Sequence, residues 1–270
     1  MSNSNNKREK EEDTLQEESI DIEIKDEEEQ IQEEEDRDEG EKLILTPSDL
    51  ERFIEEYEQT KKNKARAEIL DRLAEYSDIP VIKEFLIDVA NRDNYPLCRA
   101  KAISNLSCWI EEKDIQNLIL SKLSDVSPKV RLWAIWTIRP VIHLREIQDN
   151  IINKIKFSEK SRQIKLWMIR ILSDQIHTEY IQEVFLYFFK LNPDVETKKL
   201  LLYYLLPKLN NEDILYTISR HVQHEKNNEI RLEIVKHLIL VDEPDVKYLL
   251  ENLLKTERNE EILEILKTKN

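Results

Sequence analysis

The chain has 270 residues and a net charge of −15, with one glycine and two cysteines. The phosphate-binding loop, the dinucleotide-binding turn and the nucleophile elbow each need several glycines, so a single glycine disfavours all three. It also favours helices over a sheet with tight turns, and leaves asparagine to fill left-handed positions at helix C-terminal ends. Asparagines stand in suitable gaps between the expected helices, at Asn63, Asn94, Asn210, Asn211, Asn227, Asn228 and Asn259.

The cysteines and the apolar segments bear on where the chain works. Cys98 and Cys108 are too few for a disulfide framework, and no apolar N-terminal stretch has the form of a secretory signal. No apolar run approaches the ~20 residues that span a bilayer. We therefore expect a soluble protein in a reducing, cytoplasmic setting, with no membrane partner.

Residues 1–46 carry 19 acids, 6 bases and no aromatic residue. Such a segment cannot bury enough apolar surface to offset its chain entropy, so we expect a disordered acidic tail. Ile20, Ile22 and Ile24 alternate with acids and resemble short motifs that bind ubiquitin-like modifiers, although a chance cluster is the favoured interpretation. Residues 47–270 form the expected folded domain.

The folded domain is predicted to open with a helix that has Thr46 as its N-cap and Pro47 as its first residue. From there on, an apolar residue followed by a base recurs at intervals of 33, 32, 34, 33 and 33 residues, with one threonine as the polar exception. The pairs are Ala65-Arg66, Cys98-Arg99, Val130-Arg131, Ile164-Lys165, Thr197-Lys198 and Ile230-Arg231. A period in this range indicates one helical unit stacked many times.

Each recurring pair marks the second helix of a unit. Positions four and eight after the start of the pair are apolar in every copy, which gives the helix one buried face. A first helix is marked about sixteen residues earlier by a further apolar residue, at Leu50, Ile82, Ile115, Ile147, Ile181, Ile214 and Val246. A degenerate last helix begins near Asn259, which brings the count to seven helix pairs.

Two segments, residues 93–103 and 125–135, share an order of Asp, Pro, apolar-Arg and Ala. In this they resemble HEAT repeats, and the resemblance extends over nearly all of residues 47–270. It implies an all-α fold, a right-handed α-solenoid of about seven antiparallel helix pairs in a HEAT-like superhelix. Di-iron hydroxylases and phycobilin lyases are similar to this repeat class. However, His224-Glu225 is the one His-Glu pair here, and nothing indicates a chromophore site.

From Arg99 onward, the base of each recurring pair has an acid or amide six residues before it. Charges that are partly buried between helices need such partners, so we interpret these residues as a structural ladder and not as a phosphate-binding stripe. We expect each base to bond across the turn between its two helices and to the next repeat. The members are Asp93, Arg99, Asp125, Arg131, Glu159, Lys165, Lys198, Glu225 and Arg231.

Catalytic and metal-binding patterns are weak in this sequence. His221, His224 and Glu225 match neither order found in zinc proteases, and no third ligand is in view. No Ser-His-Asp set is assembled by spacing. We therefore expect no catalytic residue, no metal and no cofactor, and a protein that is not an enzyme.

All four tryptophans lie in residues 99–170, a stretch with 14 bases and 7 acids. On the second helices, positions two, three and six after the start of the pair lie outside or at the edge of the buried face. We expect the residues there to form a partner-binding patch on the concave surface: Leu132, Trp133, Trp136, Leu166, Trp167, Arg170 and Tyr203. The alternative is that Trp133 and Trp167 fill the seam between neighbouring second helices.

The sequence therefore predicts a non-catalytic protein–protein interaction scaffold or adaptor that holds a peptide or helical segment of another protein. The acidic tail would regulate access to the basic middle repeats, and its removal is expected to tighten the binding of an acidic partner at low salt. One alternative is a nucleic-acid-binding or repair module on the same basic, Trp-rich repeats. Another is a phycobilin-lyase-like enzyme, which would retain a coloured chromophore on purification. The partner and the oligomeric state stay open.

Overall fold

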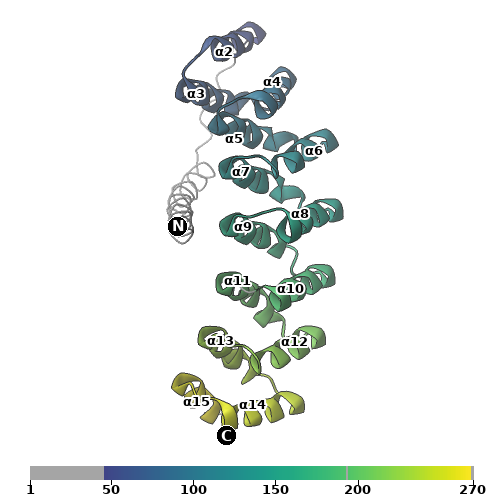
Figure 1. The fold of residues 1–270 in the computed structure, drawn as a ribbon. Helices are drawn as coiled ribbons and strands as arrows, with labels where there is room; N and C mark the ends of the chain where they lie inside the picture. The colour runs from purple at the N-terminus through teal and green to yellow at the C-terminus, as the bar shows by residue number, and fades with distance from the viewer. Residues whose placement is uncertain (1–45, 193, 269–270) are drawn as a thin grey trace, which may run out of the picture. The chain divides into compact units, whose positions relative to one another are not determined.

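A computed structural model of the chain describes residues 46–192 and 194–268 (Figure 1). Apart from Thr46, the predicted acidic tail lies outside the described residues, and so do Ile20, Ile22 and Ile24. The chain divides into two compact units, residues 1–76 and 77–270.

The described residues form fourteen α-helices in consecutive pairs and contain no strand. The first unit holds α2 (Pro47–Gln59) and α3 (Asn63–Leu73). In the second unit the first helices are α4 (Pro80–Arg92), α6 (Lys113–Lys122), α8 (Arg145–Phe157), α10 (Glu179–Leu191), α12 (Glu212–Val222) and α14 (Pro244–Thr256). Its second helices are α5 (Pro96–Asn105), α7 (Pro128–Ile138), α9 (Arg162–Ser173), α11 (Val195–Leu205), α13 (Asn228–Leu238) and α15 (Glu260–Lys267). The predicted all-α fold of seven helix pairs is confirmed.

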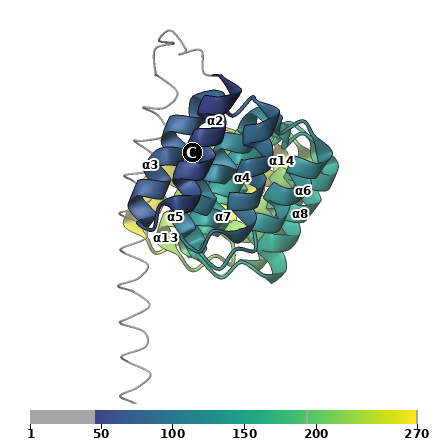
Figure 2. The same ribbon diagram turned by 90° about the horizontal axis from the view of Figure 1, so that it is seen from above.

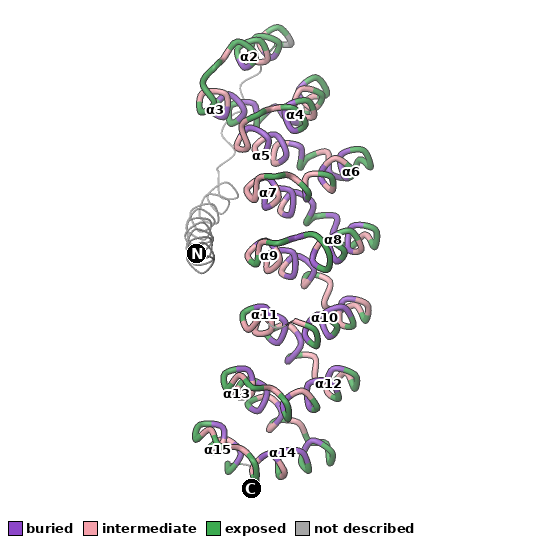
Figure 3. The backbone as a smooth tube through the Cα atoms, viewed as in Figure 1, coloured by how far each residue is buried: buried purple, intermediate pink, exposed green. Residues whose placement is uncertain are grey.

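Within the second unit the first helices stack in one row and the second helices in another (Figures 1 and 2). The second helices inside the row pack on the first helix of their own pair and on the second helices before and after them, as α7 does on α6, α5 and α9. The buried faces of the two rows meet between them (Figure 3). A second helix inside the row therefore has neighbours on three sides.

The recurring pairs mark the second helices as predicted. The helices α3, α5, α7, α9, α11 and α13 each begin two residues before their pair. The residues four and eight positions after the start of the pair are buried in all six helices, and the predicted marks of the first helices are buried as well. The predicted start of α2 is also confirmed, because Thr46 Oγ1 accepts from the Asp49 amide while the Asp49 carboxylate accepts from the Thr46 amide.

The prediction that asparagines fill left-handed helix ends is wrong. No non-glycine residue among those described has a positive φ. Asn211, Asn227 and Asn259 lie instead at the N-caps of α12, α13 and α15, where their side chains accept backbone N–H groups. The first N–H groups of a helix have no partner within the helix, and a capping side chain satisfies them.

The ladder bases bond across the turn and to the next repeat as expected, but the acid six residues before the base contributes its backbone carbonyl and not its side chain. Arg131 Nη1 donates to the backbone carbonyl of Asp125, six residues before it, at 3.0 Å. Its Nε and Nη2 donate to both carboxylate oxygens of Glu159 in the next repeat, at 2.8 and 3.0 Å. The acid six residues back thus offers its backbone to the base, and its carboxylate binds the base of the preceding repeat.

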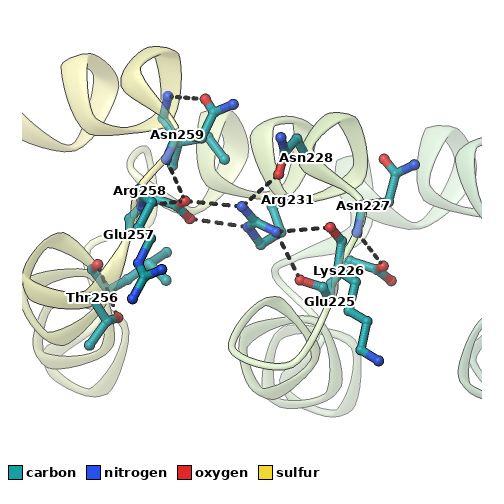
Figure 4. A network of polar contacts seen from close by, with 11 residues as sticks. Glu225, Lys226, Asn227, Asn228, Arg231, Thr256, Glu257, Arg258 and Asn259 are labelled. Atoms are coloured by element: carbon teal, nitrogen blue, oxygen red, sulfur yellow. Dashed lines mark hydrogen bonds and ion pairs between the residues drawn. The ribbon is translucent and has the colours of Figure 1, made fainter.

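The same arrangement recurs at two other joints of the second unit. Arg99 donates to the Asp93 carbonyl and, through two nitrogens, to Asp125. Arg231 donates to the Glu225 carbonyl and to both oxygens of Glu257 (Figure 4). Lys198 makes a single ion pair with Glu225 at 2.7 Å. Each of these four joints is thus fixed by a nearly dry, charge-assisted contact.

The ladder has one neutral step within the described residues. Lys165 makes no ion pair with any of them, and the equivalent acceptor in the next repeat is the amide of Asn192. Asn192 keeps the second role of the ladder acids, because its Oδ1 accepts from the Asp194 amide at 3.0 Å, as Asp125 accepts from the Ser127 amide. The joint between α9 and α11 therefore lacks the charge-assisted contact of the others.

A second recurring set joins three of the helix pairs to the turn before each of them. Gln116, Gln148 and Gln182 donate from Nε2 to the carbonyls of Ile110, Ile142 and Ile176, at 3.0, 3.0 and 2.9 Å. Each glutamine directly follows the buried isoleucine that marks its first helix. This regular placement is visible in the sequence, although the spacing of charged residues did not point to it.

Candidate binding surface on the second helices

Three neighbouring second helices, α7, α9 and α11, carry large side chains at one register position, six residues after the start of the recurring pair. These residues are Trp136, Arg170 and Tyr203, and we call them the central strip. Tyr203 is 71% exposed, while Trp136 and Arg170 are half-buried. The shared register brings one side chain from each helix to the open side of the second-helix row.

Two indole rings and two guanidinium groups are in contact at the strip, with the rings tilted by 54° to each other. The ring centres of Trp136 and Trp167 are 4.7 Å apart. Arg170 Cζ lies 4.4 Å from the centre of Trp167, and Arg139 Cζ lies 5.8 Å from the centre of Trp136. Arg139 is held in turn by Asp174, to which it donates at 2.8 and 3.3 Å. Cation–π contacts of this kind order the side chains before any ligand binds.

Tyr203 is supported from beneath by other aromatic rings. Its ring meets Tyr204 edge to face at 5.1 Å, and Tyr204 lies 6.0 Å from Phe185, which is fully buried on α10. An exposed tyrosine held in this way offers apolar contact and a hydroxyl with little loss of side-chain entropy.

The predicted exposure is wrong for two of the seven patch residues. Leu132 is 3% exposed and Trp167 is 7% exposed, so both belong to the core. The reason is that neighbouring second helices cover both flanks of α7 and α9, which buries a wider arc than one stripe facing the first helix. The alternative that placed Trp167 in the seam between second helices describes it correctly, whereas Trp133 and Leu166 are half-buried.

The buried side of Trp167 includes an unusual atom. Its Nε1 is buried and has no hydrogen-bond partner among the described residues. An unpaired buried N–H group costs free energy, so this nitrogen offsets part of the stabilisation that the packing of the ring provides.

Charge on this part of the row is one-sided. Helices α5, α7 and α9 carry seven bases and no acid: Arg99, Lys101, Lys129, Arg131, Arg162, Lys165 and Arg170. Arg99 and Arg131 are held in the ladder, and Arg162 lies 3.9 Å from Asp194. The surface is therefore basic, but several of its charges already have protein partners.

The histidine cluster that the sequence singled out belongs to the ladder. His221 Nε2 lies 2.7 Å from Glu225 Oε2, which also accepts from Lys198, and His224 is exposed. Burial raises the pKa of Glu225, but hydrogen bonds from Lys198, the Asn227 amide and His221 outweigh it and lower the pKa to about 2. In the described part of the chain, no three His, Cys, Asp or Glu residues are grouped closely enough to hold a metal ion.

One open cavity, of about 770 Å³, lies away from the central strip. It is formed by the turns that follow α9, α11 and α13, and its lining includes His177, Asn211, His237 and Leu240. None of the predicted patch residues lines it. The central strip is thus not part of this cavity.

No family model and no curated protein sequence matches this chain. Its structure is similar to that of YibA of Escherichia coli, with a TM-score of 0.51 and 16% identity over 82% of this chain and 81% of that one. Together with the seven helix pairs and their ladder, this likeness decides the fold. The chain has a HEAT-like repeat fold.

Two further solved structures are similar at lower scores. A HEAT-like repeat protein of the archaeon Thermococcus onnurineus has a TM-score of 0.44 and 12% identity, over 84% of this chain and 97% of that one. Human deoxyhypusine hydroxylase has a TM-score of 0.37 and 12% identity, over 83% and 84%. Across the described parts of this HEAT-like array, no helix is long and apolar enough to cross a membrane.

Proposed function

We propose that this HEAT-like array is a non-catalytic scaffold that holds a segment of another protein on the second helices of its middle repeats. The observation that carries the proposal is the central strip, in which Trp136, Arg170 and Tyr203 share one register position on α7, α9 and α11. Tryptophan, arginine and tyrosine are the residue types most enriched where partner proteins bind tightly.

The test compares two matched pairs of substitutions in the full chain. Arg170→Ala with Tyr203→Ala removes two strip residues. Arg220→Ala with Tyr216→Ala removes the same residue types from the exposed part of α12, in the row of first helices. Affinity capture with quantitative mass spectrometry should identify a protein that the wild type and the α12 pair retain and the strip pair loses by at least tenfold. Equal capture by both pairs would contradict the proposal.

Nucleic acid is a second candidate ligand for the same surface, because α5, α7 and α9 carry seven bases and no acid. The ladder weakens this candidate, since two of those bases are already paired with carboxylates. Fluorescence anisotropy with labelled single-stranded DNA and RNA decides it: phosphate-driven binding must fall steeply as salt rises. Binding that is undetectable at low salt removes the candidate.

A further inference from the structure

A second surface lies on the turns that join the two helices of each middle repeat. Val126 lies in the turn α6–α7, while Phe157 and Leu191 are the last residues of α8 and α10, where the turns α8–α9 and α10–α11 begin; their exposed fractions are 90%, 81% and 63%. We call the described residues at these three turns the turn edge. Among the described residues of the second unit, the other turns within repeats expose no large apolar side chain. Exposure of large apolar side chains to water is unfavourable. Their recurrence at three successive turns therefore marks this edge as a binding surface.

The three turns form one continuous edge. Lys154 at the end of α8 donates to Ser124 in the turn before α7. Arg162 at the start of α9 lies 3.9 Å from Asp194 at the start of α11. Lys156 Nζ lies 4.4 Å from the ring centre of Tyr187 on α10, one helical turn before Leu191. Contacts between neighbouring turns thus place the exposed apolar residues along one side of the array.

The turn edge is also basic. Residues 154–165 hold five bases and one acid, Glu159, and Lys156 and Lys160 are exposed. The next turn adds exposed Lys190 beside Leu191. The carboxylates of Asp125 and Glu159 are turned inward to the ladder, where their side chains are 10% and 3% exposed. Two acids at the start of α11, Asp194 and Glu196, form ion pairs with Arg162 and Lys199, so the exposed lysines dominate the charge that this edge presents to solvent.

We propose that the turn edge binds the surface of a lipid bilayer that contains anionic lipids. Apolar side chains that protrude from turns enter the boundary between headgroups and acyl chains, and the lysines beside them meet the anionic headgroups. Tyr187 is 46% exposed, and tyrosine favours this boundary because one end of it is apolar and the other polar.

A bilayer fits the edge better than a nucleic acid does. Nucleotide bases stack on aromatic rings, but only two of the four exposed apolar residues here are aromatic, Phe157 and Tyr187, and the aliphatic Val126 and Leu191 suit acyl chains instead. The expectation of no membrane partner rested on the lack of a spanning segment, and binding at a membrane surface requires none. The edge shares no residue with the central strip, so this inference does not depend on the proposed function.

The test uses the full chain, sedimented with vesicles of phosphatidylcholine alone or with phosphatidylserine added. We expect binding to the anionic vesicles only. Lys156→Ser with Lys160→Ser should weaken it about 25-fold, since each lysine near an anionic surface contributes about fivefold. Phe157→Ser with Leu191→Ser should weaken it at least tenfold, because apolar surface no longer enters the bilayer.

Matched controls come from other exposed positions of the second unit. Lys226→Ser with Lys236→Ser and Tyr216→Ser with Tyr248→Ser should leave vesicle binding within about twofold of the wild type. Thermal melting verifies that every variant is folded. No binding to anionic vesicles, or equal losses in edge and control variants, overturns the proposal. Binding of labelled RNA that depends on Lys156 and Lys160, without binding of vesicles, overturns it in favour of a nucleic-acid edge.

Discussion

Trp167 and Tyr203 are both large aromatic residues on second helices, and the sequence assigned both to one exposed patch. In the structure Trp167 packs against Trp136 of α7 and is 7% exposed, whereas Tyr203 is 71% exposed. At the scale of single residues, the patch therefore divides into core side chains, such as Leu132 and Trp167, and surface side chains. The expected effects of substitution differ accordingly.

Trp167→Ala is expected to lower the free energy of unfolding by about 3–5 kcal/mol, because it empties a packed site and removes the ring on which Trp136 and Arg170 rest. Tyr203→Ala is expected to lower it by less than about 1 kcal/mol, since most of its surface already meets water. Urea unfolding followed by circular dichroism measures both values. A loss for Tyr203→Ala as large as that for Trp167→Ala would place the strip in the core.

At the scale of helices, the joints between repeats combine apolar packing with the ladder. Arg131 and Glu159 form a bidentate ion pair in which the side chains are 14% and 3% exposed. Arg231 forms the same kind of pair with Glu257. Removing one partner of such a pair leaves a nearly dry charge unpaired, which costs far more than the net contribution of the intact pair. The neutral step at Asn192 avoids that cost but gives up the contact.

Asn192→Glu is expected to complete the ladder at the joint of α9 and α11. A glutamate there can accept from Lys165 as Glu225 accepts from Lys198, and the gain in the free energy of unfolding should be about 0.5–1.5 kcal/mol. Urea midpoints of the full chain measure the gain. The control is the same substitution in a Lys165→Met background, where the gain should vanish. A gain of equal size in both backgrounds would show that the new carboxylate acts elsewhere.

At the scale of the whole molecule, the ladder links stability to pH. Burial raises the pKa of Asp125, Glu225 and Glu257, but hydrogen bonds from Arg99, Lys198 and Arg231 outweigh it and leave each pKa below its ordinary value. A carboxyl whose pKa is lowered by folding stabilises the folded state above its unfolded pKa, and this contribution is lost as pH falls through the folded pKa.

Stability is therefore expected to change little above pH 4.5 on account of these groups and to fall between about pH 4.5 and 2, the interval given by the ordinary and the lowered pKa of Glu225. Glu225→Gln should lower stability at neutral pH by roughly 3 kcal/mol and flatten the decline below pH 4.5. Melting temperature against pH measures both effects. The exposed substitution Glu260→Gln serves as control, and an unchanged slope in Glu225→Gln would contradict the account.

The sequence by itself determined the period, the starts of the second helices, the buried positions of both helix rows and the cap at Thr46. These features depend on the residues of a single helix and its ends, because the spacing of apolar side chains decides which face a helix buries. The tertiary structure alone decided that Glu159 binds the base of the preceding repeat, that Leu132 and Trp167 are core residues, and that the middle turns form one apolar, basic edge. Each of these depends on what lies on the far side of a neighbouring helix, which the projection of one helix does not contain.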